Sequence, residues 1–180
     1  MRTLKAFLIG AILLNSWNAL ASGEVKISIK LWPAGDFVAH TKRIKGGPFK
    51  TGADSWVAKN VLLDLKSLKT GLELRDKHMI EKYFEVNEKD YGVAVLVQAK
   101  GEGGKFTGKL KLHGKTSNVS GTYQIKGLMV LAKFKTKLSQ FHIKKAEYMN
   151  VGVEDEVNVE VNIAFTDKKP TKKTRRKKRR

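Results

Sequence analysis

The sequence is dominated by segments in which apolar and polar residues alternate one by one. In residues 25–31 every odd position is Val, Ile or Leu, and two lysines and a serine lie between them. Successive side chains of a β-strand point to opposite faces, so this pattern predicts a strand with one buried and one solvated face. The same period recurs in residues 37–44, 57–65, 91–99, 105–113, 118–125, 128–138 and 157–165. We therefore expect a mainly β protein with about eight strands.

Most junctions between these segments carry glycine, as at Gly46-Gly47, residues 101–104, Gly114 and Gly127. Glycine permits tight turns, and short connections join antiparallel neighbours, whereas parallel strands need long crossovers. About eight antiparallel strands with one apolar face each form either a sandwich or a closed barrel. The chain has no cysteine, so the Cys, Trp, Cys pattern of immunoglobulin domains is missing and a barrel is favoured. An eight-stranded barrel is either filled by side chains or holds one small ligand.

One stretch breaks the period of two. Between residues 71 and 88, apolar residues recur at helical spacing at Leu72, Met79, Ile80, Tyr83 and Phe84. This spacing predicts one amphipathic helix packed on or across the sheet. Arg75, Asp76 and His78 fall near its start. The negative charge of Asp76 at this position would interact favourably with the positive end of the helix dipole.

The two ends of the chain differ from the body. Residues 1–21 have Arg2 and Lys5, a nine-residue apolar run and the small-residue ending Ala19-Leu20-Ala21. This is the layout of a secretory signal peptide cleaved after Ala21, and the run is too short to span a bilayer. Residues 168–180 hold ten Lys or Arg and no acid, which predicts a disordered basic tail. Residues 22–167 form the expected domain, with 24 basic and 17 acidic residues.

The sequence carries no motif of enzymatic chemistry. The four histidines, at 40, 78, 113 and 142, are dispersed and lack the spacing of a zinc site. No nucleophile elbow, phosphate loop or dinucleotide fingerprint is present, and Gly101-Glu102-Gly103-Gly104 is more simply a hairpin loop. We therefore expect a protein that is not an enzyme and has no catalytic residue, metal or cofactor.

Two motifs follow each other along the chain. Residues 65–79 contain a Ser, hydrophobic, x, Thr turn at 67–70, and Arg75, Asp76, His78 and Met79 follow it on the predicted helix. Residues 108–116 form a Gly, x, Leu, x, hydrophobic, x, Gly, x, Thr strand and turn. Together these motifs resemble the YceI-like family of exported lipid-binding proteins. The resemblance covers residues 25–165, while residues 32–50 fit it loosely and the basic tail is not part of it.

The resemblance implies a lipocalin-like antiparallel barrel in the bacterial periplasm. Its apolar interior would hold an isoprenoid lipid such as an isoprenoid quinone or a polyprenyl phosphate. The wall candidates lie on the apolar faces of their segments, and they are Val61, Leu63, Phe106, Leu110, Leu112, Tyr123 and Ile125, with Met79 and Phe84 closing one end. Arg75 or His78 is a candidate contact for an anionic head group. A network of these residues that braces the helix start is the structural alternative.

Two other functions remain open from the sequence. The ten charges of residues 168–180 can bind the phosphates of nucleic acid or another anionic polymer, although an export signal argues against nucleic acid. The same tail can bind an anionic membrane surface. Alternatively, the apolar faces fill the barrel completely, and the protein is a solid-cored envelope stress protein. The cavity is the feature that separates this alternative from a lipid carrier.

Overall fold

The structure is a computed structural model that describes residues 22–33, 35–144, 147–148 and 151–167. The predicted signal peptide, residues 1–21, and the predicted basic tail, residues 168–180, lie outside the described residues. Within the described part of the chain, no helix is both long enough and apolar enough to cross a bilayer.

Each of the eight alternating segments contains a strand, so the period of two located the strands correctly. The eight longer strands are β1 (Gly23–Trp32), β2 (Asp36–Thr41), β5 (Ser55–Asp64), β6 (Val93–Glu102), β7 (Lys105–Leu112), β8 (Lys115–Lys126), β9 (Met129–Lys137) and β12 (Glu156–Ala164). The shorter strands are β3 (Ile44–Lys45), β4 (Phe49–Gly52), β10 (Glu147–Tyr148) and β11 (Val151–Val153).

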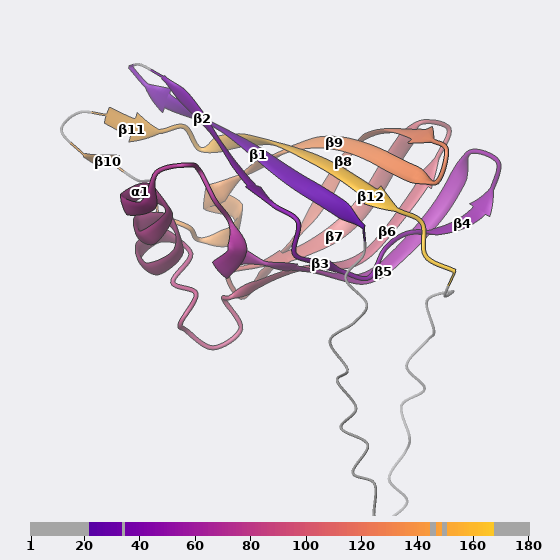
Figure 1. The fold of residues 1–180 in the computed structure, drawn as a ribbon, viewed down its shortest axis with the longest axis horizontal. Helices are drawn as coiled ribbons and strands as arrows, with labels where there is room; N and C mark the ends of the chain where they lie inside the picture. The colour runs from indigo at the N-terminus through magenta and orange to yellow at the C-terminus, as the bar shows by residue number, and fades with distance from the viewer. Residues whose placement is uncertain (1–21, 34, 145–146, 149–150, 168–180) are drawn as a thin grey trace, which may run out of the picture.

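The strands form one antiparallel sheet that curls into a nearly closed barrel (Figure 1). The sheet runs β1, β12, β9, β8, β7, β6, β5, with β2 on β1 at one edge and β3 on β5 at the other. Lys42 and Arg43 are all that separates β2 from β3 along the chain, so this corner brings the two edges together. The N–H of Thr166 also donates to the carbonyl of Pro48 at 2.8 Å. The predicted lipocalin-like barrel is confirmed, and the sandwich is excluded.

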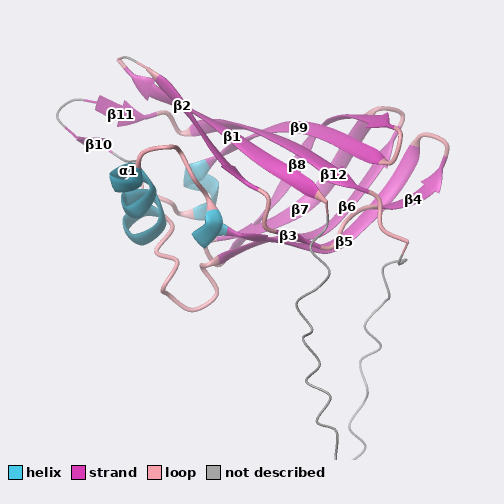
Figure 2. Cartoon of the chain, in the orientation of Figure 1, coloured by secondary structure: helices cyan, strands magenta, loops and turns pink. Residues whose placement is uncertain are grey.

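Helical segments gather at one end of the barrel (Figure 2). The predicted helix is present but shorter than residues 71–88: α1 (Glu73–His78) continues into the π-helical turn η2 (Met79–Tyr83). Two 3₁₀ turns, η1 (Leu65–Ser67) and η3 (Leu138–Phe141), lie at the same end. We call this end, which also carries the β1–β2 and β7–β8 turns, the helix end.

The opposite end of the barrel carries the β4–β5, β6–β7 and β8–β9 hairpins, and we call it the hairpin end (Figure 1). Both described chain ends leave from this side of the barrel, because β1 begins and β12 ends there, with Gly23 paired to Ile163. Residues 1–21 and 168–180 are therefore connected to the barrel far from the helices.

Candidate functional site

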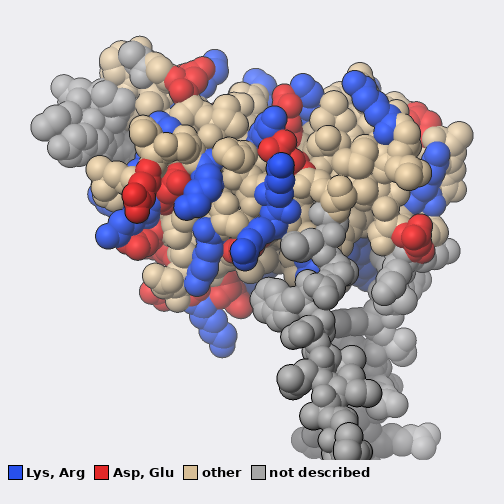
Figure 3. All heavy atoms as spheres, in the orientation of Figure 1, with Lys and Arg blue, Asp and Glu red and all other residues tan. Residues whose placement is uncertain are grey.

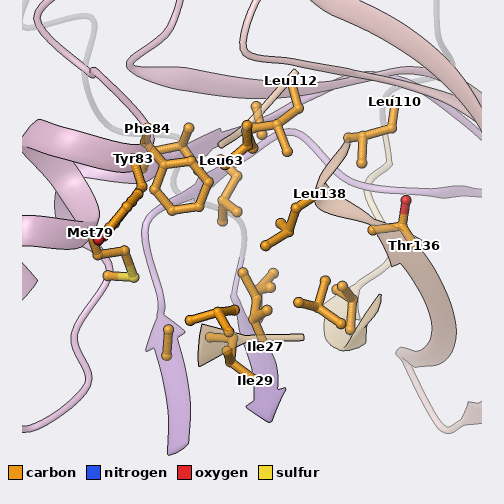
Figure 4. A pocket seen from close by; sticks show the side chains of 18 of the residues that line it. Ile27, Ile29, Leu63, Met79, Tyr83, Phe84, Leu110, Leu112, Thr136 and Leu138 are labelled. Carbon is orange, nitrogen blue, oxygen red and sulfur yellow. The ribbon is translucent and has the colours of Figure 1, made fainter. Parts of the chain in front are cut away.

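The barrel encloses a cavity of about 980 Å³, and its exposed lining residues Leu72 and Leu74 place the mouth at the helix end. Side chains from opposite walls point into it, among them Ile27 and Ile29 from β1, and Leu110 and Leu112 from β7 (Figure 4). Its volume is at the upper end of the 300 to 1,000 Å³ that small-molecule sites commonly occupy. The barrel is therefore hollow, although its strands carry the same alternating pattern that could have filled it.

The cavity is long as well as apolar. Along β1 it is lined by every inward residue from Val25 to Leu31. A strand rises by about 3.3 Å per residue, so these positions alone span about 20 Å. Among the described residues, the lining side chains with polar groups are Arg75, His78, Tyr83, Thr136 and Lys144. This shape suits a long hydrocarbon chain better than a compact polar metabolite.

Six of the nine predicted wall residues line the cavity. Val61 and Leu63 project from β5, Leu110 and Leu112 from β7, and Met79 and Phe84 from the helical segment. Figure 4 shows Met79, Tyr83 and Phe84 grouped on one side of the space, where the helical segment covers it. Whether these six contact a ligand stays a prediction.

The other three, Phe106, Tyr123 and Ile125, do not line the cavity. Phe106 and Tyr123 pack against Trp56, with ring centroids 6.0 and 5.4 Å apart, and Phe106 meets Phe134 at 5.9 Å. We call these four rings the aromatic plug. Ile125 lies on β8 near the hairpin end, opposite Val130. The plug fills the barrel at the hairpin end, and of its four rings only Phe134 borders the cavity.

Two glycines make room for the aromatic plug. A Cβ atom at Gly101 would overlap the indole of Trp56, and one at Gly121 would lie 2.9 Å from the Phe106 ring. Real Cβ atoms do not approach that closely, so a larger residue at either position would displace a ring. The Tyr123 hydroxyl donates to the carbonyl of Asp54 at 2.8 Å. Burial of this hydroxyl raises the pKa of Tyr123.

The mouth of the cavity is organised around Thr70 and two residues of α1. The Asp76 carboxylate accepts hydrogen bonds from the Thr70 N–H at 2.7 Å and the Thr70 hydroxyl at 2.6 Å, and Lys69 lies 3.6 Å away. Burial disfavours the charged carboxylate, but these bonds and the nearby cation outweigh it, so the pKa of Asp76 lies below its usual value. This network braces the turn into the helix, as the structural alternative expected.

Arg75 belongs to this network and also lines the cavity. Its Nε donates to the Thr70 hydroxyl at 2.9 Å and its Nη2 to the Thr70 carbonyl at 2.8 Å. The guanidinium lies 4.2 Å from the centre of the Phe37 ring on β2. No carboxylate of the described chain forms an ion pair with Arg75 within 4 Å. The structure thus holds a positive charge at the cavity mouth that is positioned by neutral partners.

The remaining polar groups of the lining come from several elements. His78, the second predicted head-group contact, is the last residue of α1 and lies three residues after Arg75. It also lines the cavity. Lys144 follows η3, and Thr136 is a buried residue of β9 whose hydroxyl lies 3.4 Å from the Gln140 side-chain oxygen. The described residues contain no group of three His, Asp or Glu that could hold a metal ion.

The sequence prediction missed most of the cavity wall. The inner faces of β1 and β12 line it throughout, at Val25, Ile27, Ile29, Leu31, Val157, Val159, Val161 and Ile163. The sequence could have predicted these residues, because both segments alternate strictly between apolar and polar positions. Leu138, Ile143 and Val153 also line the cavity but lie in short or irregular segments. Periodicity alone could not assign them to an inner face.

Comparisons with known proteins show which family and which solved structures this chain is similar to. The family model for the YceI-like domain matches residues 17–165. The crystal structure of BcnA from Burkholderia cenocepacia is similar with a TM-score of 0.61 and 20% identity, over 80% of this chain and 96% of that chain. A polyisoprenoid binding domain from Saccharophagus degradans, implicated in plant cell wall breakdown, is similar with a TM-score of 0.54 and 14% identity, over 80% and 95%.

No curated protein matches the sequence of this chain. The two structural similarities extend over nearly the whole of the other chains and show the barrel fold. The family model covers the barrel from before its first strand to the residue after its last, and it includes the Thr70, Arg75 and Asp76 network. The chain therefore belongs to the YceI-like domain family.

Proposed function

We propose that the protein is an exported binding protein that holds an isoprenoid lipid inside its barrel. The observation that carries this proposal is the apolar cavity of about 980 Å³, about 20 Å or more in length. The similar domain from Saccharophagus degradans is described as polyisoprenoid binding, which supports the same class of ligand. Export rests on residues 1–21 and would place the protein in the periplasm.

The energy of binding would come from burial of the lipid tail. At about 25 cal/mol per Å², burial of roughly 400 Å² of apolar ligand surface contributes about 10 kcal/mol. Losses of translational and conformational freedom reduce this figure on binding. The walls offer hydrogen-bonding groups mainly near the mouth, so they favour a hydrocarbon chain over a polar ligand along most of their length.

The head group would lie at the mouth, near Arg75. Its guanidinium has a full charge and no carboxylate partner among the described residues, so an anionic phosphate or a quinone carbonyl can accept a hydrogen bond from it. His78 lines the same part of the cavity. These two side chains bind the head group in our proposal and take no part in a reaction.

The proposal is tested by what the purified protein carries. The protein is produced with residues 1–21 in a bacterial host, extracted with organic solvent, and the extract is analysed by mass spectrometry. We expect an isoprenoid at close to one molecule per protein. An extract without isoprenoid, from protein that circular dichroism shows to be folded, would contradict the proposal.

A pair of variants on β7 tests the position of the ligand. Leu110→Trp places an indole in the cavity, whereas Lys109→Trp places the same group on the exposed outer face of the same strand. Overpacking costs about 1–3 kcal/mol, so bound lipid should fall about tenfold or more in Leu110→Trp. It should be unchanged in Lys109→Trp. Full lipid content in a folded Leu110→Trp protein would show that the ligand does not reach this wall.

The cavity argues against the alternative of a solid-cored envelope protein, since the apolar faces of the strands enclose space instead of filling it. The other alternative, binding of nucleic acid or an anionic polymer, depends on residues 168–180, which lie outside the described residues.

A further inference from the structure

Large apolar side chains are exposed around the mouth of the cavity. Trp32 is 67% exposed, Leu72 is 59% and Leu74 is 68%. Leu72 and Leu74 also line the cavity, so its apolar wall continues onto the outside of the protein there. Trp32 ends β1 directly after Leu31, which lines the cavity at the same end. We call Trp32, Leu72 and Leu74 the apolar rim.

The fold holds the apolar rim in place. Leu72 and Leu74 follow Gly71, whose φ of +84° is a left-handed conformation that suits glycine. The next turn is fixed by the hydrogen bonds of Asp76 and Arg75 to Thr70. Arg75 also contacts Phe37 of β2, which ties α1 to the β1–β2 hairpin that carries Trp32. These exposed side chains therefore sit on braced elements.

We propose that the apolar rim is a docking surface that inserts into the interface of a lipid bilayer containing anionic lipids. This inference rests on the proposed function, because an isoprenoid that is insoluble in water has to enter the cavity from a membrane. A mouth pressed against the bilayer would give the lipid an apolar path from membrane to cavity along Leu72 and Leu74. Trp is well suited to this position, since its amphipathic ring favours the membrane–water interface.

The size of the apolar rim favours a bilayer over a protein partner. Its three side chains expose about 400 Å², which is within the range of the functional patches seen on monomeric proteins. A stable dimer needs about 800 Å² from each partner, so the rim alone is too small to hold a second copy of the chain. Insertion of a few large side chains into an interface needs no such area.

The net charge supports an anionic surface as the target. Without residues 1–21 the chain has 34 basic and 17 acidic residues, a net charge of +17, so an anionic bilayer attracts it at long range. At the rim itself the charges are balanced, because Asp36 lies opposite Lys30 in the β1–β2 hairpin and Glu73 lies four residues before Lys77 in α1. Basic and acidic side chains are interspersed on the face shown in Figure 3. Attraction thus brings the protein to the bilayer, and apolar insertion keeps it there.

Trp32 reports directly on this docking. The only other tryptophan of residues 22–180 is Trp56, which is 4% exposed and belongs to the aromatic plug. The full mature chain is mixed with vesicles of phosphatidylcholine and phosphatidylglycerol, with and without bromine on the acyl chains. We expect a blue shift of the emission and quenching by bromine. The signal should be missing in Trp32→Phe, and unchanged emission of the wild type with both vesicles would overturn the inference.

Matched variants distinguish the effect of the apolar rim on vesicle binding from the effect of any exposed leucine. Trp32→Ala and Leu74→Ser should each lower vesicle partitioning about tenfold, because each removes one large inserted side chain. Leu128→Ser is the control, since Leu128 is 79% exposed at the β8–β9 turn on the hairpin end and does not line the cavity. Binding is measured in about 1 M salt, where charge attraction is screened within about 3 Å. An equal loss for Leu128→Ser would overturn the inference.

Solvent extraction of the same proteins distinguishes failure of the docking from failure of the proposed function. Trp32→Ala should keep its bound isoprenoid but take up added lipid from vesicles more slowly. If Trp32→Ala carries isoprenoid and also partitions into vesicles as fully as the wild type, the docking surface is contradicted and the proposed function is not. Quenching of Trp32 in a protein whose extract holds no isoprenoid would support the docking surface and contradict the function.

Discussion

At the scale of single residues, the structure shows how one buried charge organises the cavity mouth. Asp76 is 6% exposed and accepts two hydrogen bonds from Thr70. Thr70 in turn receives hydrogen bonds from Arg75 through its hydroxyl and its carbonyl. The carboxylate therefore positions, through one threonine, the cation that we propose as the head-group contact.

Replacement of Asp76 tests this arrangement. Asp76→Asn should lower the free energy of unfolding at pH 7 by about 1–3 kcal/mol, because the two hydrogen bonds from Thr70 lose their charged acceptor and the ion pair with Lys69 is removed. Glu73→Gln, at an exposed position of the same helix, is the control and should change it little. Urea unfolding followed by circular dichroism measures both. A stability of Asp76→Asn equal to that of the wild type would contradict the role assigned to the network.

The pH dependence of stability follows from the same carboxylate. The pKa of Asp76 is lower in the folded protein than its usual value of 3.8. Its stabilising contribution is therefore fully present above that value and is lost as pH falls through the folded pKa. Asp76→Asn should flatten the acid limb of a plot of unfolding free energy against pH, compared with the wild type. Parallel acid limbs for the two proteins would refute this assignment.

At the scale of elements, His113 joins the segments that cover the cavity. It lies in the β7–β8 turn, is 8% exposed and packs against Tyr91, with ring centroids 4.0 Å apart and the ring planes tilted by 40°. Its Nε2 lies 2.9 Å from the Glu85 carboxylate after η2, and its Nδ1 lies 3.2 Å from the Phe141 carbonyl at the end of η3. Residues of both η2 and η3 line the cavity, so one side chain connects two parts of its cover.

His113→Ala should loosen both covering segments without unfolding the barrel. We expect faster hydrogen exchange in residues 79–88 and 138–143, and a loss of about 1–3 kcal/mol of stability, because the Phe141 carbonyl and the Glu85 carboxylate lose a buried partner. His40→Ala is the matched control, since His40 is exposed on the outside of β2. Exchange rates that are unchanged in both segments would show that His113 does not hold them.

At the scale of the whole molecule, the barrel separates the cavity mouth from the chain termini. The mouth lies at the helix end, whereas both described chain ends leave near the hairpin end (Figure 1). A basic tail that begins at residue 168 would therefore attach to the side of the barrel away from the apolar rim. Tail and rim can then act as two independent membrane contacts, one electrostatic and one apolar.

Truncation after Asp167 tests this division. Each Lys or Arg near an anionic surface contributes about 1 kcal/mol, so engagement of half of the ten charges would contribute about 5 kcal/mol at low salt. The truncated protein should keep its melting temperature and its bound lipid. Its co-sedimentation with anionic vesicles at low salt should fall to the level that the full chain shows at high salt. Equal co-sedimentation of the two proteins would contradict a role for the tail, and tight binding of the full chain to nucleic acid but not to vesicles would favour the alternative function.

Much of the fold could be predicted from the sequence, because strand patterning is local. The alternation in residues 25–31 or 157–165 fixes which side chains share a face, whatever those strands pack against. The helix was harder, since its regular part ends at His78 and the π-helical turn Met79–Tyr83 then places Tyr83 and Phe84 over the cavity. Spacing alone does not reveal such a turn.

The sequence by itself determined the inward faces, and only the tertiary structure decided where they enclose space. Phe106 and Leu110 lie on the same face of β7, yet Phe106 belongs to the aromatic plug and Leu110 lines the cavity. The difference arises because Trp56, fifty residues earlier in the chain, meets Phe106 over Gly101 of the intervening strand β6, and Phe134 meets Phe106 over Gly121 of β8. Whether a barrel is filled or hollow at a given level depends on side chains that meet from different strands, and periodicity within one strand carries no information about them.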